Sequence, residues 1–68
     1  MSWVAVDKFG DEILFSAEPF RMGLSWCSDE ELADQGRYDG QVLVPGTIHE
    51  LIGRSLTWED EPVELQKG

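Results

Sequence analysis

Two β-prone runs near the start of the chain constrain its fold more than any other feature. They cover residues 3–6 (Trp-Val-Ala-Val) and 13–17 (Ile-Leu-Phe-Ser-Ala), and residues 7–10 (Asp-Lys-Phe-Gly) lie between them. Because Asp and Gly favour tight turns, this region predicts a β-hairpin. Neighbouring residues within each run are both apolar, so both faces of the hairpin need a cover from the rest of the chain.

Only a short chain is available to provide that cover. The chain has 68 residues and a single cysteine, Cys27, so no internal disulfide can stabilise it. A hydrophobic content of 41% with three tryptophans is nevertheless too apolar for a disordered acidic tail. We expect one globular domain spanning residues 1–68, in a reducing, cytoplasmic setting.

Two short helices are predicted from capping boxes, in which Ser or Thr is followed three positions later by Glu. The first covers residues 28–36, with Ser28 as its cap, and the second covers residues 47–53, with Thr47 as its cap. A Gly residue ends each helix. Three apolar residues of the second helix form a stripe that is expected to face the core, namely Ile48, Leu51 and Ile52.

Further strands are predicted at residues 24–27 and 41–44, and extended chain at residues 56–58 and 62–65, interrupted by a turn or bulge at residues 59–61. This order of elements predicts an α+β, mainly β fold. It fits either a small antiparallel sheet or an SH3-like small barrel, with one or two short helices.

Two groups of residues carry a resemblance to known proteins. The group near the C-terminal end comprises Pro45-Gly46-Thr47-Ile48, Leu51-Ile52-Gly53-Arg54, Leu56-Thr57-Trp58, Asp60 and Pro62-Val63, and the group near the start comprises Trp3, Asp7-Lys8, Gly10, Phe15, Pro19 and Arg21. In these residues the chain resembles short uncharacterised proteins of gut bacteria and their phages, apart from an insert at residues 28–36. The resemblance implies a bacterial or phage setting and assigns no functional residue.

Candidate catalytic and metal-binding residues are few. His49 is expected to face solvent beside the apolar stripe of its helix. Cys27 lies next to Trp26 and is expected to be a small buried apolar residue. The acids at residues 29–31 lie in the first turn of a helix, and those at residues 59–61 are consecutive, so their side chains diverge. We therefore expect a protein that is not an enzyme and has no catalytic, metal or cofactor site.

The charge of the chain limits its partners. Fourteen acidic residues against five basic ones leave a net charge of −9, which repels nucleic-acid phosphates and anionic lipids. The apolar runs are also far shorter than the roughly 20 residues of a membrane span. A protein partner, preferably a basic one, is expected, with no direct nucleic-acid binding and no membrane insertion.

The clearest candidate for partner binding lies near the C-terminal end. Trp58 is expected to be partly exposed, and four acids follow it closely, namely Glu59, Asp60, Glu61 and Glu64. We expect a small acidic protein-binding module. A more specific hypothesis is that this module is derived from a phage and acts as a nucleic-acid mimic towards a basic partner. The alternative is a structural accessory subunit or an obligate homo-oligomer, in which a partner completes an edge strand or an apolar face.

Overall fold

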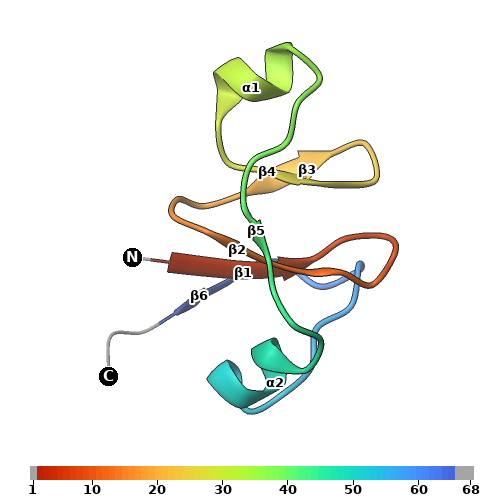
Figure 1. Cartoon of the computed structure of the whole chain (residues 1–68), viewed down its shortest axis with the longest axis vertical. Coiled ribbons are helices and arrows are strands. Elements are labelled where there is room, and N and C mark those ends of the chain that lie inside the picture. Colours follow the sequence, from red (N-terminus) through yellow and green to blue (C-terminus); the bar gives the residue numbers. More distant parts are fainter. Residues whose placement is uncertain (1, 66–68) are drawn as a thin grey trace.

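Strand β1 lies near the centre of the fold, and the rest of the chain is arranged around it (Figure 1). The computed structural model describes residues 2–65. Its elements are β1 (Ser2–Val6), β2 (Glu12–Phe15), β3 (Phe20–Met22), β4 (Ser25–Cys27), α1 (Glu30–Asp34), β5 (Gln41–Val42), α2 (Thr47–Ile52) and β6 (Val63–Leu65). No helix in residues 2–65 is long and apolar enough to cross a membrane.

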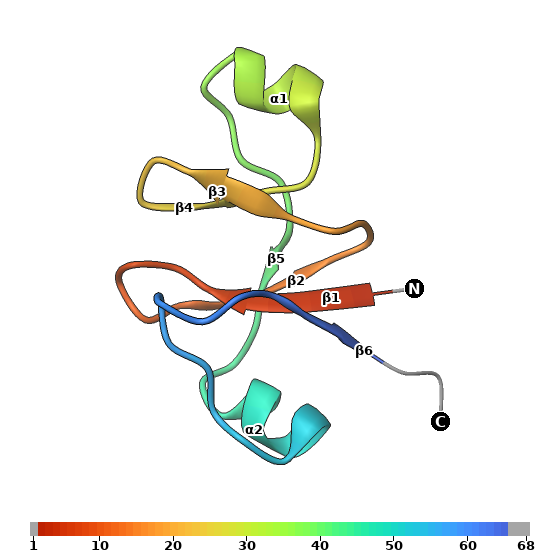
Figure 2. The ribbon, with the colours of Figure 1, turned by 180° about the vertical axis from the view of Figure 1, so that it is seen from behind.

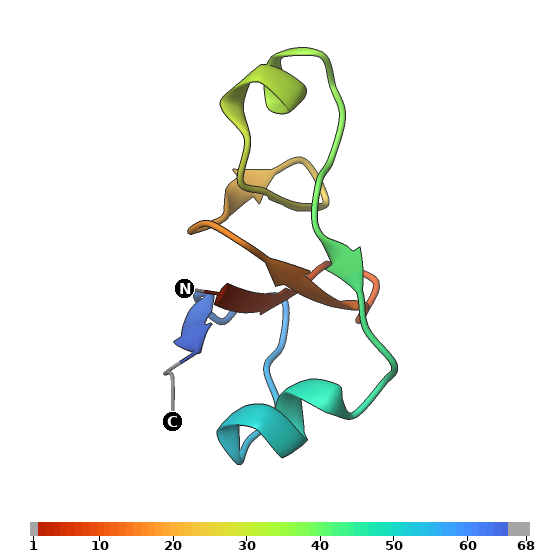
Figure 3. The same cartoon turned by 60° about the vertical axis from the view of Figure 1, so that its left-hand side comes forward.

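Four strands form an antiparallel sheet in the order β5-β2-β1-β6, and β3 pairs with β4 in a separate hairpin. The predicted α+β, mainly β fold is therefore confirmed. Of the two predicted architectures, the small sheet is the one observed. Strands β5 and β6 lie at its opposite edges and do not pair to close a barrel (Figure 3).

The first two strands form the predicted hairpin, with Ala5 opposite Ile13 in the register. One Asp7 carboxylate oxygen accepts the backbone N–H groups of Phe9 and Asp11, both at 2.9 Å. These bonds lie within the turn itself, which is why the sequence alone identifies it.

Alternate residues of β1 enter two separate cores on opposite faces of the sheet. The first core contains the buried residues Val4, Val6, Ile48 and Leu56. The second core contains the buried residues Ala5, Ile13, Phe15 and Trp26. Helix α2 lies on one side of the sheet, and the β3–β4 hairpin with α1 lies on the other (Figures 1 and 2). Both faces of the β1–β2 hairpin are covered, as its apolar sequence requires.

Helix α1 begins one residue later than predicted. Its N-cap is Asp29, whose carboxylate accepts the N–H groups of Glu31 and Leu32. The Ser28 hydroxyl is engaged elsewhere, because it donates to the carboxylate of Asp39. The predicted cap at Ser28 is therefore wrong, since a carboxylate that is distant in sequence takes its hydroxyl.

Helix α2 also lacks the predicted capping box. Its N-cap is Gly46, which makes no side-chain cap bond, and the Thr47 hydroxyl donates to the Val44 carbonyl. The expected stripe is partly wrong as well. Ile48 is buried and Ile52 packs against it, but Leu51 remains 52% exposed.

Strand β5 is shorter than the predicted run over residues 41–44. It ends at Val42, and Val44 beyond it is 75% exposed. The predicted turn before the last strand is present: Asp60 donates its N–H to the Thr57 carbonyl, and its carboxylate accepts the Thr57 N–H at 2.8 Å.

Candidate functional site

The tryptophan that was predicted to bind a partner serves the fold. Trp58 is half-buried and packs edge-on against Trp26, with ring centroids 5.6 Å apart. The guanidinium carbon of Arg21 lies 4.5 Å from the Trp26 ring centroid and 4.4 Å from that of Trp58. A cation shared by two aromatic rings stabilises this arrangement. Trp58 is partly exposed, as predicted. Its ring already contacts the Arg21 guanidinium of the same chain.

The acids near Trp58 do not form one cluster. Asp60 bonds the N–H and the hydroxyl of Thr57, and Glu59 accepts the same hydroxyl at 3.4 Å. Trp58 and Glu59 line a shallow hollow together with Lys8, while Glu64 lies opposite Trp3 in the β1–β6 ladder. The remaining predicted acid, Glu61, is exposed.

The two candidate catalytic residues lie on different parts of the molecule. His49 is exposed on α2. Cys27 is fully buried on β4, where its thiol donates to the carbonyls of Asp29 and Arg37 at 3.3 and 3.6 Å. They do not form a nucleophile and base pair. Within residues 2–65, no group of three or more His, Cys, Asp or Glu side chains could hold a metal ion.

A different surface gathers the exposed apolar side chains. Four of them line one groove of about 490 Å³, and their exposed fractions are Phe9 73%, Val42 67%, Tyr38 50% and Leu24 47%. Buried Ile13 also lines this groove. We call this feature the apolar groove. Exposed apolar side chains that gather in one hollow are typical of interaction sites, whereas single ones are common on any protein.

Two turns and one crossing segment build the apolar groove. Phe9 lies in the β1–β2 turn and Leu24 in the β3–β4 turn, and the two turns are joined because the Lys8 N–H donates to the Leu24 carbonyl at 3.0 Å. Tyr38 and Val42 come from the segment that crosses to β5. The Tyr38 hydroxyl lies so close to Gly23 that a Cβ there would approach it to 3.1 Å.

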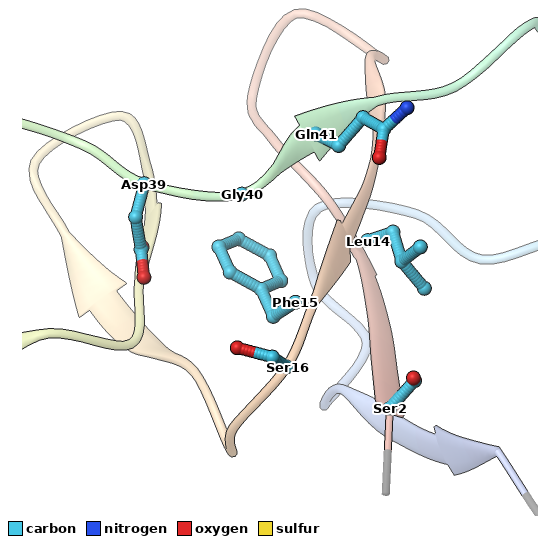
Figure 4. Close-up of a pocket in the computed structure, with 7 residues that line it drawn as sticks. All are labelled: Ser2, Leu14, Phe15, Ser16, Asp39, Gly40 and Gln41. Atoms are coloured by element: carbon cyan, nitrogen blue, oxygen red, sulfur yellow. The ribbon is translucent and has the colours of Figure 1, made fainter.

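The crossing segment reaches the sheet because residue 40 has no side chain. Gly40 has a φ of 92°, and a Cβ at this position would lie 2.6 Å from the Phe15 ring and 2.7 Å from Ile13. Figure 4 shows the backbone at Gly40 passing over the Phe15 ring. This close approach positions Tyr38 and Val42 on either side of the crossing point.

The groove is negatively charged at its edge. Asp7 and Asp39 are among its lining residues, and the described lining residues include no basic side chain. Asp7 is only 7% exposed and its carboxylate bonds the β1–β2 turn, so the partly exposed Asp39 is the more accessible of the two acids. Partial burial alone would raise the pKa of Asp39, but hydrogen bonds from the Ser28 hydroxyl and N–H hold it below its ordinary value of 3.8. Asp39 is therefore ionised at neutral pH.

A second hollow adjoins the same crossing segment (Figure 4). It measures about 300 Å³ and is lined by Ser2, Leu14, Phe15, Ser16, Asp39, Gly40 and Gln41. Hydroxyl, amide and carboxylate groups surround it, so it suits a small polar group. It shares Asp39 and Gly40 with the apolar groove.

The reasoning from sequence missed the apolar groove. The sequence does contain a signal for it. Phe9 and Leu24 are large apolar residues within turn sequences, and a side chain in a turn is expected to remain exposed. That the two turns meet, and that Tyr38 joins them, depends on tertiary contacts.

The chain matches no protein-family model, no curated protein and no solved structure.

Proposed function

We propose that this protein is a small non-enzymatic binding module that captures a basic protein segment in the apolar groove. The single observation that carries this proposal is the convergence of four exposed apolar side chains on one groove edged by carboxylates. Aromatic side chains such as Phe9 and Tyr38 are frequent anchors of protein interfaces, because they bury much area at little cost in conformational entropy.

The charge of the chain supports a basic partner over a second copy. Each copy carries a net charge of −9, so self-association brings like charges together, whereas a basic segment is attracted to Asp7 and Asp39. The charges of the chain support the nucleic-acid mimic less directly than they support a groove that binds a basic segment. A mimic depends on a row of available acids, and the acids predicted to form one beside Trp58 do not gather in one cluster.

Capture from a bacterial lysate with tagged protein at low and high salt tests this proposal. The double variant Phe9→Ser/Tyr38→Ser alters the groove, and Leu51→Ser is the matched control, because Leu51 is about as exposed as Tyr38 but lies on α2. The expected result is a protein that the wild type and the control retain at low salt and that the double variant does not retain. Equal retention by all three proteins would refute the groove as the binding site, and so would retention by none.

A further inference from the structure

The free edge of strand β5 borders the apolar groove. Val42 lies opposite Ile13 and Gln41 lies opposite Leu14 in the antiparallel ladder with β2. One residue further along, the Leu43 N–H donates to the Glu12 carbonyl at 2.8 Å. Opposite residues in an antiparallel ladder alternate between hydrogen-bonded and non-hydrogen-bonded pairs. The backbone N–H and C=O of Val42 therefore point away from β2.

In the part of the chain that the structure describes, no other strand pairs with these two backbone groups. Strand β5 stands at the end of the sheet order, and none of the hydrogen bonds found among residues 2–65 outside the regular ladders involves Val42. The Val42 side chain is 67% exposed and lines the groove. An uncovered strand edge beside an apolar groove is the arrangement used for strand addition, in which backbone bonds give affinity and alternate side chains give specificity.

We propose, on the basis of the proposed function, that the partner binds by adding an extended basic segment to the outer edge of β5. The segment exchanges backbone hydrogen bonds with Val42 and places an apolar side chain among Phe9, Leu24 and Tyr38. A Lys or Arg two positions away along the added strand lies on the same face and pairs with Asp39.

Charge selects this occupant. The described lining residues of the groove include the partly exposed Asp39, the buried Asp7 and no basic group. A second copy of the chain would bring another net charge of −9 to the same edge. The edge is also short, because β5 contains two residues, so the side chains in the groove must supply a large share of the affinity.

Selection from a phage-displayed library of random peptides provides the probe. Peptides that bind the wild-type protein are expected to combine Lys or Arg with apolar residues at alternating positions. Their binding is then measured to Val42→Pro, which removes the outward N–H and leaves the bonds between Gln41, Leu43 and β2 in place. The matched control is Val42→Ala, which keeps the N–H and shortens the side chain.

We expect Val42→Pro to weaken peptide binding by about tenfold, the upper range for one lost hydrogen bond, and Val42→Ala to weaken it less. Hydrogen exchange on the unmodified protein gives a second readout that needs no variant. The Val42 amide should exchange quickly in the free protein and slowly in the complex.

Each outcome is decisive. Strand addition is refuted if Val42→Pro binds the peptides as the wild type does, or if the Val42 amide gains no protection. In that case, loss of binding in Phe9→Ser/Tyr38→Ser would still support the groove and the proposed function. If the selected peptides bind this double variant unchanged, the proposed function fails as well. A library that yields no binder, or only acidic ones, also refutes strand addition.

Discussion

The carboxylate of Glu12 on β2 accepts the backbone N–H of Ile48 in the first turn of α2, at 2.7 Å and across 36 positions of the chain. Its other oxygen accepts the Gly46 N–H, also at 2.7 Å. One side chain of the sheet thus caps the helix that covers one of its faces. The free N–H groups at a helix start favour such an anion.

Replacing Glu12 with Ala should lower the free energy of unfolding by about 1–2 kcal/mol, because two N–H groups at the start of α2 lose their acceptor. Denaturant titration measures this loss. Glu50→Ala is the matched control, since Glu50 is the acid of the capping box that the sequence predicted at Thr47, and the structure leaves it exposed. The control should change stability by less than about 0.5 kcal/mol. A larger loss in Glu50→Ala than in Glu12→Ala would contradict the observed cap.

Gly40→Ala should be destabilising by more than about 2 kcal/mol, because a Cβ would collide with Phe15 and Ile13 in addition to straining the backbone. Gly46→Ala separates the two effects. Gly46 has a similar φ of 94°, but a Cβ there meets nothing within 4 Å, so only the backbone cost of about 1 kcal/mol applies. Thermal or denaturant unfolding of both variants tests the difference. Equal losses would show that the crossing segment does not approach the sheet so closely.

Arg21→Met should lower the free energy of unfolding by about 0.5–2 kcal/mol, because the uncharged side chain keeps apolar contact with Trp26 and Trp58 but loses the cation. Near-ultraviolet circular dichroism should change with it, since both rings adjoin the substituted group. Arg54→Met is the control at another exposed arginine. An unchanged spectrum and an unchanged stability in Arg21→Met would argue against the shared cation.

Ser28→Ala should raise the pKa of Asp39 towards its ordinary value, because the hydroxyl bond that favours the carboxylate is lost. In the wild type the folded pKa lies below the unfolded value near 3.8. The stabilisation from Asp39 is therefore complete above that value and is lost as the pH falls through the folded pKa. In Ser28→Ala this loss of stability on acidification should be smaller. An NMR titration of the Asp39 carboxyl carbon in both proteins measures the pKa directly, and identical curves would contradict the prediction.

Elements whose bonds are local were predicted well. The Asp7 turn and the ends of the helices at Gly36 and Gly53 depend on contacts within a few residues, and those contacts are visible in the sequence. The caps of the two helices were predicted wrongly. Each assignment followed a local motif, whereas Ser28 is held by Asp39 and α2 is capped by Glu12.

The candidate site shows the same division. Trp58 was predicted to be partly exposed, and it is, but the sequence does not reveal that Arg21 lies against its ring. Phe9, Leu24 and Tyr38 belong to three separate segments, and their meeting depends on the bond between Lys8 and Leu24 and on the close approach at Gly40.

The sequence by itself determined the apolar hairpin, its need for a cover on both faces, and the negative charge that disfavours nucleic-acid and lipid partners. Local turn chemistry and composition are enough for those conclusions. Only the tertiary structure decided which side chains cap the helices, that Trp58 packs with Trp26, and that four exposed apolar residues share one groove. Those outcomes depend on contacts between residues far apart in the chain, where several partners compete for the same hydroxyl, N–H group or aromatic ring.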